Sequence, residues 1–277
     1  MDENDAELAI RAASAGAEVA RSLYGRQLAR FAKSAVDFAT EADLAAEQAI
    51  METLRDARPE DGFVGEESGS VAGATSGRTW LVDPLCGTLN YAARTPLVAV
   101  NVALRVGDRV TAAAVADPFS AEVFWTDGVT ACLRAGGRDE PLIPDQASRL
   151  VDLNLDPPFP GQDRFRTARM LHDEAFVSRF HPRVLSTTLA LAWVAAGRHA
   201  AYVSDGDLRD SVHFSSGIAL CQAAGCVVTG LAGQPVHTGV QGLVAAADRQ
   251  THADLVAIAA RSTGGGAALP VTGRSGS

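Results

Sequence analysis

The hydrophobic pattern of this 277-residue chain changes its period near Phe63, and that change strongly restricts the possible folds. Before Phe63, apolar residues recur at helical spacing and predict two amphipathic helices, at 5–24 and 40–57. After it, short β-branched runs separated by Gly, Asp and Pro predict a sheet-forming middle. Beyond residue 151 helical and strand patterns alternate, so we expect helices and sheets packed in layers. The strands are predicted at 79–82, 98–105, 109–116, 122–126, 199–203, 226–229 and 243–246, and the later helices at 168–179, 186–196, 214–224 and 253–261.

A proline-rich segment at 141–163 is the predicted crossover between two halves of the chain. We predict an N-terminal α+β half at 1–140 and a C-terminal α/β half at 141–261, which together form one compact fold. Residues 262–277 are rich in Gly, Ser and Thr and contain few apolar residues, which predicts a disordered tail.

Composition and charge argue against several classes of protein. A net charge of −9 argues against binding to a nucleic-acid backbone, which requires clustered Lys and Arg. No apolar run approaches the roughly 20 residues that span a bilayer, so we expect no membrane anchor. The four cysteines occur without a secretion signal at the start, which predicts a reducing compartment and a cytoplasmic location. The expected partners are small molecules.

Two acidic residues follow the first predicted strand of the middle region. The segment Gly65-Glu66-Glu67-Ser68-Gly69 comes directly after the apolar pair Phe63-Val64, so its carboxylates lie just past a strand end, where α/β sites are built. An isolated Glu-Glu pair would more simply be a solvated turn. Lys33, the only lysine, is interpreted as a solvated residue at a helix end.

A second motif places a carboxylate beside a possible anion site. The apolar strand Trp80–Val82 carries Asp83 to its carboxyl end, and Pro84 prevents further sheet pairing. The pair Gly87-Thr88 can then open a helix whose free N–H groups face an anion. Magnesium suits such a place because it takes oxygen ligands and accepts substrate phosphate in its shell. Without the preceding motif, an Asp-Pro turn followed by Gly would be unremarkable.

The two motifs, taken in order, resemble the paired signature of the inositol monophosphatase family. Three further segments match the family in the same order, and the matches together cover about residues 5 to 260. They are the helix-opening segment 37–43, the substrate-side segment made of 186–188 with 194–198 and 201–202, and the last motif at 212–217 with 224–225.

The resemblance implies a five-layer αβαβα sandwich, like that of inositol monophosphatase and fructose-bisphosphatase, and a metal-dependent phosphomonoester hydrolase. Glu66, Asp83 and the backbone carbonyl of Leu85 would hold one magnesium ion, with manganese or zinc as alternatives. Asp43, Thr88 and Glu66 would be catalytic, and Asp43 and Thr88 would orient the attacking water. The implied substrate is an inositol phosphate, a sugar phosphate or a nucleotide-like phosphomonoester, and the implied assembly is a homodimer. The expected substrate-binding residues are Gly87, Thr88, Ser186, Asp205 and Asp207.

Two positions depart from the family pattern at metal ligands. Cys86 and His213 occupy places where the family has metal-binding Asp, and both would serve the second metal. Three interpretations remain open. The second metal is absent or weak and hydrolysis continues, which is our working hypothesis. Alternatively, Cys86 and His213 join Asp83 in a softer site suited to zinc or iron. In the third, hydrolysis has been lost and the pocket binds a phosphorylated ligand or a partner protein.

Overall fold

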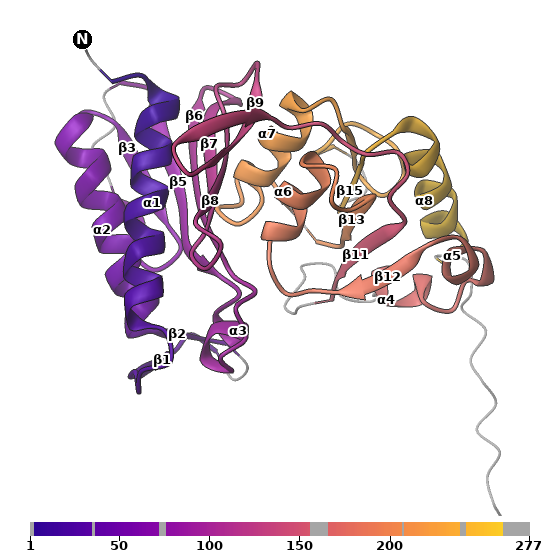
Figure 1. The fold of residues 1–277 in the computed structure, drawn as a ribbon, viewed down its shortest axis with the longest axis horizontal. Helices are drawn as coiled ribbons and strands as arrows, with labels where there is room; N and C mark the ends of the chain where they lie inside the picture. The colour runs from indigo at the N-terminus through magenta and orange to yellow at the C-terminus, as the bar shows by residue number, and fades with distance from the viewer. Residues whose placement is uncertain are drawn as a thin grey trace, which may run out of the picture.

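The computed structural model describes residues 3–34, 37–71, 76–155, 166–206, 208–238 and 242–262, which form five layers (Figure 1). Helices α1 (Asp5–Leu23) and α2 (Glu41–Ala57) cover the outer face of a large sheet. Helices α6 (Leu189–Ala195) and α7 (Ser215–Ala223) lie between that sheet and a smaller one. Helices α4 (Arg166–Met170), α5 (Glu174–Arg179) and α8 (Arg249–Arg261) cover the other face of the smaller sheet. This is the αβαβα order predicted from the sequence.

Local hydrogen bonds explain where the first two helices begin. The side chain of Asn4 accepts the N–H of Glu7 at 2.8 Å and caps α1. Thr40 caps α2, and the Asp43 carboxylate returns to the N–H of Thr40 at 2.8 Å, which completes a capping box. The helices begin where the amphipathic pattern predicts, because polar capping residues stand directly before each apolar stripe.

Alternate residues along the strands of the large sheet face opposite sides, so the sheet separates two hydrophobic cores. Within the described residues its strand order is β10-β9-β8-β7-β6-β5-β3-β4, and pairing is antiparallel except between β3 and β5. In β6, Val100 and Val102 pack toward α1 and α2, whereas Ala99 and Asn101 have the opposite parity and face α6 and α7. The strands are β3 (Gly62–Gly65), β4 (Gly69–Val71), β5 (Arg78–Cys86), β6 (Ala99–Val106), β7 (Arg109–Asp117), β8 (Glu122–Thr126), β9 (Ala131–Ala135) and β10 (Arg138–Pro141).

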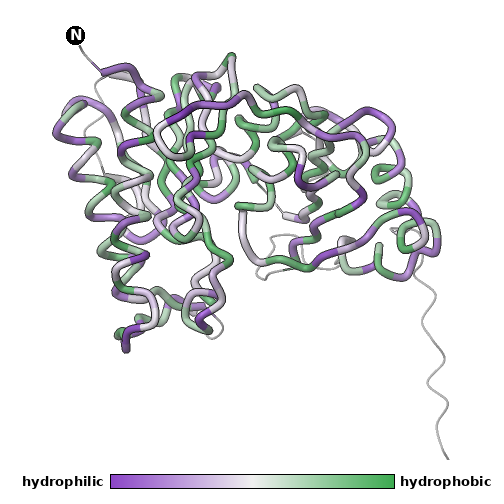
Figure 2. The backbone as a smooth tube through the Cα atoms, in the orientation of Figure 1, coloured by the Kyte–Doolittle hydropathy of each residue, from purple (hydrophilic) through white to green (hydrophobic). Residues whose placement is uncertain are grey.

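The smaller sheet has the order β12-β11-β13-β15-β14 and packs on the middle helices through Tyr202, Leu243 and Ala245. A separate pair, β1 (Arg30–Ala32) with β2 (Phe38–Thr40), leads into α2, and the short helix α3 (Thr88–Ala92) follows β5. The remaining strands are β11 (Leu150–Asn154), β12 (His181–Val184), β13 (Ala201–Ser204), β14 (Val227–Thr229) and β15 (Leu243–Ala246). Hydrophobic residues concentrate along the helices and strands that face one another (Figure 2).

Several expectations about elements need correction. The single helix predicted at 168–179 is two helices, because Asp173 caps α5 through the N–H of Phe176 and ends the previous turn. The predicted crossover at 141–163 contains β11, whose buried Val151 and Leu153 pair with strands on both sides. The predicted tail lies outside the described residues from 263 onward. In the part of the chain that the structure describes, no helix is long and apolar enough to cross a membrane.

Gly217 gives a test of the middle layer. A Cβ added there would lie 2.7 Å from Leu191 Cβ, so α6 and α7 approach too closely for alanine. Alanine improves helix propensity by about 1 kcal/mol, but overpacking costs about 1–3 kcal/mol. We expect Gly217→Ala to lower the free energy of unfolding in urea denaturation. The control Gln222→Ala, on an exposed position of the same helix, should change it by less than about 0.5 kcal/mol. A stabilised Gly217→Ala variant would contradict the close packing of these helices.

Candidate functional site

Asp83 and Cys86 reach the same site because β5 is irregular between them. Asp83 pairs with Asn101 of β6, and the register then shifts so that Cys86 pairs with Ala99. Three residues of β5 thus span two of β6, which is the pattern of a bulge. In a regular strand Asp83 and Leu85 would share a face. Instead Leu85 packs into a separate core cluster, and Cys86 contacts the middle helices.

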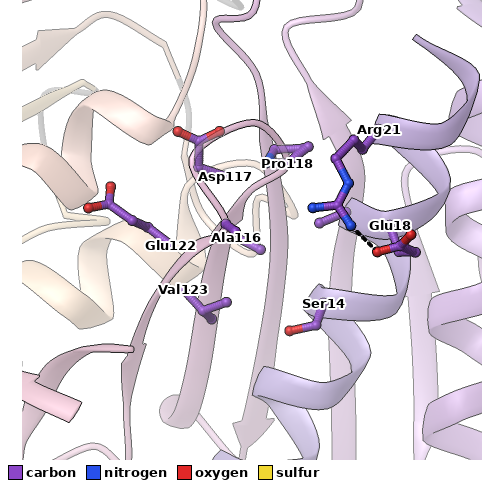
Figure 3. A pocket seen from close by; sticks show the side chains of 10 residues that line it. Ser14, Glu18, Arg21, Ala116, Asp117, Pro118, Glu122 and Val123 are labelled. Carbon is purple, nitrogen blue, oxygen red and sulfur yellow. Dashed lines mark hydrogen bonds and ion pairs between the residues drawn. The ribbon is translucent and has the colours of Figure 1, made fainter. Parts of the chain in front are cut away.

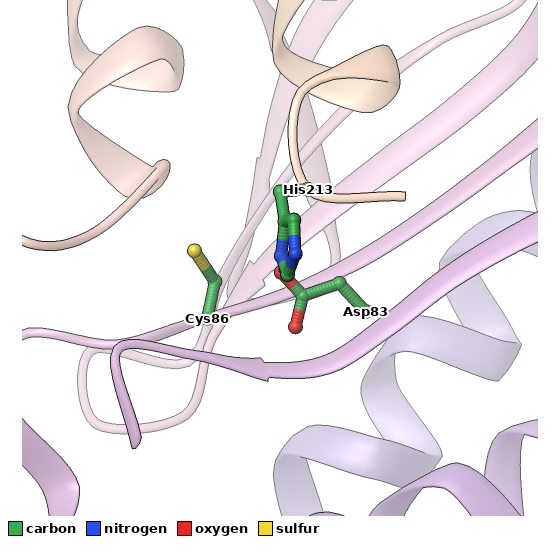
Figure 4. A group of neighbouring side chains, drawn as sticks. All are labelled: Asp83, Cys86 and His213. Atoms are coloured by element: carbon green, nitrogen blue, oxygen red, sulfur yellow. The ribbon is translucent and has the colours of Figure 1, made fainter. Parts of the chain in front are cut away.

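His213 brings the start of α7 to Asp83 from 130 residues away in the chain. Its Nδ1 lies 2.7 Å from Asp83 Oδ2 and 3.9 Å from Glu66 Oε2. One ligand atom each from Asp83, Cys86 and His213 lies within 4.8 Å of the others (Figure 4). Asp83 is fully buried, whereas the side chain of His213 is 40% exposed. The group therefore has one buried side and one open side.

Backbone and amide groups hold this cluster in place. The N–H of Leu85 donates to Asp83 Oδ1 at 3.1 Å, and the N–H of Thr188 donates to Cys86 Sγ at 3.3 Å. Asn101 Nδ2 donates to Thr188 Oγ1 at 2.9 Å and lies 3.4 Å from Asp83 Oδ2. Asn101 was not predicted from the sequence, and Thr188, within the matched segment 186–188, was not predicted to contact Cys86. The signal for Asn101 was a polar residue in the middle of an apolar strand, which is buried only with partners.

Glu66 lies beside the same group, in a loop fixed by hydrogen bonds. The carboxylate of Glu47 accepts the N–H groups of Glu67 and Ser68 at 2.9 and 2.8 Å. Lys33 donates to Glu66 Oε1 at 2.7 Å and to Glu67 Oε1 at 2.6 Å. The prediction that Lys33 lies at a helix end was wrong: the residue follows β1, and its ammonium forms ion pairs with two carboxylates that the fold places together.

Burial and neighbouring charges perturb the acidic groups. Burial, and then the charge of Asp83, raises the pKa of Glu66 to about 8. Burial opposes ionisation of Asp83, but the adjacent imidazolium of His213 outweighs it and lowers the pKa of Asp83. Desolvation likewise opposes the charged form of His213, and Asp83 outweighs it and raises the pKa of His213. Burial and Asp83 raise the pKa of Cys86 to about 11. A bound cation would favour the ionised forms of Glu66 and Cys86 in this buried group.

Asp43 and Thr88 form a hydrogen-bonded pair next to this group. Thr88 Oγ1 donates to Asp43 Oδ1 at 2.8 Å and lies 3.2 Å from the carbonyl oxygen of Leu85. The other carboxylate oxygen of Asp43 accepts the N–H and the hydroxyl of Thr40 at 2.8 and 2.6 Å. Burial raises the pKa of Asp43. The capping box of α2 and the start of α3 therefore fix a carboxylate and a hydroxyl side by side.

The expected substrate-binding residues lie in different surroundings. Gly87 has a φ of 107° and packs closely against the carbonyl oxygens of Leu97 and Ser186, at distances where a Cβ would clash. The carbonyl of Ser186 also accepts the side-chain amide of Asn90 at 3.1 Å. Asp205 accepts the N–H and hydroxyl of Thr167 at 3.1 and 3.2 Å. Asp207 lies outside the described residues. Substrate binding by these residues stays a prediction.

A separate pocket lies on the opposite side of the large sheet, between α1 and strands β7 and β8 (Figure 3). Its volume is about 220 Å³, and its charged groups are already engaged. Arg21 pairs with Glu18, Asp117 accepts backbone N–H groups of its own turn, and Glu122 binds Arg198. We assign no chemistry to it.

Comparisons with known proteins show to which family the chain is similar. Residues 1–263 match the model of the inositol monophosphatase family. The inositol-1-monophosphatase of Caulobacter vibrioides is 37% identical over 218 residues, covering 76% of this chain and 82% of that protein. The Nus factor SuhB of Escherichia coli K12 is 33% identical over 204 residues, covering 73% and 74%.

Solved structures agree in fold. The extragenic suppressor protein suhB from Bartonella henselae superposes with a TM-score of 0.80 at 25% identity, covering 91% of this chain and 96% of that one. The IMPase of Thermotoga maritima superposes with a TM-score of 0.77 at 20% identity, covering 92% and 96%. From the match over most of its length and the identity to its relatives, we conclude that the chain belongs to the inositol monophosphatase family.

Proposed function

We propose that the protein hydrolyses a phosphomonoester of a small molecule in a divalent-metal-dependent reaction. The single observation that carries this proposal is the Thr88 hydroxyl, which lies between the carboxylate of Asp43 and the carbonyl of Leu85. That pair would orient a water, and it stands beside carboxylates whose oxygens can bind a cation. The phosphatase activity named for the Caulobacter relative supports the same reaction class.

Glu66, Asp83 and the carbonyl oxygen of Leu85 are the residues that would hold magnesium. The donors are all oxygen, which magnesium prefers, and burial together with the charge of Asp83 raises the pKa of Glu66 even though Lys33 and His213 act in the opposite direction. When bound, the ion would lower the pKa of a water and neutralise charge on the phosphoryl oxygens. Lys33 would keep Glu66 oriented by holding its other oxygen.

Thr88 and Asp43 would orient the attacking water and receive its proton. The hydroxyl hydrogen of Thr88 points to Asp43, so the lone pairs of Thr88 Oγ1 are the part that can accept a hydrogen bond from water. Asp43 is buried and held by Thr40, and its raised pKa makes it a better base than an ordinary aspartate. The two residues would therefore position the attacking water and accept its proton, and positioning of the nucleophile is a main contribution of the protein to phosphoryl transfer.

The proposed substrate is a small phosphorylated molecule such as an inositol phosphate, a sugar phosphate or a nucleotide-like phosphomonoester. The net charge of −9 supports a small substrate over a nucleic-acid backbone. Gly87, Ser186 and Asp205 are proposed to line its site. We also propose that the protein is a cytoplasmic homodimer. The four free thiols support a reducing compartment.

Loss of a metal-binding carboxylate should abolish hydrolysis. With inositol, sugar and nucleotide monophosphates as a substrate panel, we expect phosphate release by the parent protein with magnesium. Glu66→Gln and Asp83→Asn should lower kcat/KM at least about 100-fold, because the cation contributes several kcal/mol to the transition state. Asp108→Asn, at an exposed turn between β6 and β7, is the control and should keep the parental rate. If no substrate is turned over with magnesium, manganese or zinc, the hydrolase proposal fails and a ligand-binding role takes its place.

Thr88 allows a matched test of water orientation. Thr88→Val keeps the side-chain shape but removes the hydroxyl, so kcat should fall about 10²- to 10⁴-fold. Thr88→Ser keeps the hydroxyl and should retain most of the activity. Magnesium affinity, measured by calorimetry, should differ little among the three proteins, since Thr88 is not a proposed ligand. Parental kcat in Thr88→Val would show that the hydroxyl does not orient the attacking water.

A further inference from the structure

The donors gathered at the start of α7 do not suit a second magnesium ion. Around Asp83 the structure places the sulfur of Cys86 and the imidazole of His213, whose ligand atoms lie within 4.8 Å of one another (Figure 4). Magnesium requires oxygen donors in near-ideal octahedral geometry. A sulfur and a nitrogen donor favour borderline cations such as zinc or cobalt instead. The donor set therefore disagrees with the ion that the family pattern implies here.

We propose that Asp83, Cys86 and His213 form a binding site for a divalent cation of the zinc type. The inference goes beyond the proposed hydrolysis and does not depend on turnover, since it concerns only which ion these three side chains bind. Three protein ligands with an open fourth position are typical of catalytic zinc sites. His213 supplies the open side here, because its side chain is 40% exposed while Asp83 is fully buried.

The distances require only a small adjustment. Tetrahedral zinc has bonds of about 2.1 Å to N and O and about 2.3 Å to S, so its donors lie about 3.3 to 3.6 Å apart. His213 Nδ1 and Asp83 Oδ2, now 2.7 Å apart, would separate slightly, and the widest spacing of 4.8 Å in the group would close by about 1 Å.

The surrounding hydrogen bonds orient two of the three ligands. The N–H of Thr188 donates to Cys86 Sγ, which favours a sulfur that carries negative charge. Asp83 accepts the N–H of Leu85 on one oxygen and faces the amide of Asn101 with the other. Outer partners of this kind fix ligand geometry at metal sites.

Cobalt provides a direct test with the full-length, metal-free protein. Titration with Co²⁺ should produce a sulfur-to-cobalt charge-transfer band in the near ultraviolet with one equivalent bound, and zinc should abolish it. Millimolar magnesium should not. Cys86→Ser, which changes a single atom, should lose the band and lower zinc affinity more than about 100-fold, beyond the usual loss for an outer partner. Cys132→Ser, on β9 away from the cluster, is the control and should keep both properties.

Further measurements decide the outcome if a variant folds poorly. X-ray absorption at the zinc edge of the parent protein should show one sulfur scatterer together with nitrogen and oxygen. The double variant Cys86→Asp with His213→Asp should bind zinc more weakly and magnesium more tightly than the parent. The proposal is overturned if the band persists in Cys86→Ser, if magnesium displaces cobalt as readily as zinc does, or if sulfur is absent from the zinc shell. Failure of phosphate release with the cobalt band intact would overturn the hydrolase proposal alone.

Discussion

The negative charge of Asp83 lies where water does not reach it, and the arrangement of the site follows from how that charge is balanced. His213, the N–H of Leu85 and the amide of Asn101 all face its two oxygens. Glu66 adds a second carboxylate nearby, and Lys33 compensates only part of the combined charge. Such a group is stable when a cation occupies it or when a neighbouring base is protonated. His213 supplies the second solution when no metal is bound.

The fold makes this concentration of charge possible by placing three irregular segments at one point. The bulge in β5 turns both Asp83 and Cys86 toward the middle helices, and the segment before α7 carries His213 to the same place. The loop after β3 carries Glu66 and is fixed by Glu47 of α2. Each charged residue stands on a segment anchored by backbone hydrogen bonds. Rigid elements of two layers thus hold side chains whose mutual repulsion would otherwise separate them.

The sequence predicted the parts of the molecule that local chemistry determines. Helices α1 and α2 were found because capping residues precede an amphipathic stripe. Glu66, Asp83, Cys86 and His213 were proposed from the family resemblance of their motifs, and the structure places them close together. The expected αβαβα order of layers also agreed with the structure. Short strands were missed where burial alternates weakly, as in the fully exposed β10, and the helix at 168–179 was wrong because the Asp173 cap was overlooked. The contacts of Lys33, Asn101 and Thr188 join segments far apart in the chain, and no local pattern encodes them.

The presence of Cys86 and His213 in place of two carboxylates changes the charge as well as the softness of the site. Three aspartates would bring three negative charges, whereas Asp83, a thiolate and a neutral imidazole bring two. Without metal the difference in charge between the two sets of ligands is larger, because Cys86 stays protonated and His213 is positive. The metal-free protein therefore avoids the repulsion that a three-carboxylate cluster creates beside Glu66. Asp83 belongs to both proposed donor groups, so an ion held by Glu66 and an ion held by Cys86 would act on the same carboxylate. Cation binding at either group would then alter the cation affinity of the other group. Cys86 and His213 thereby link the identity of the cation at their own group to the affinity of the oxygen-donor group for magnesium.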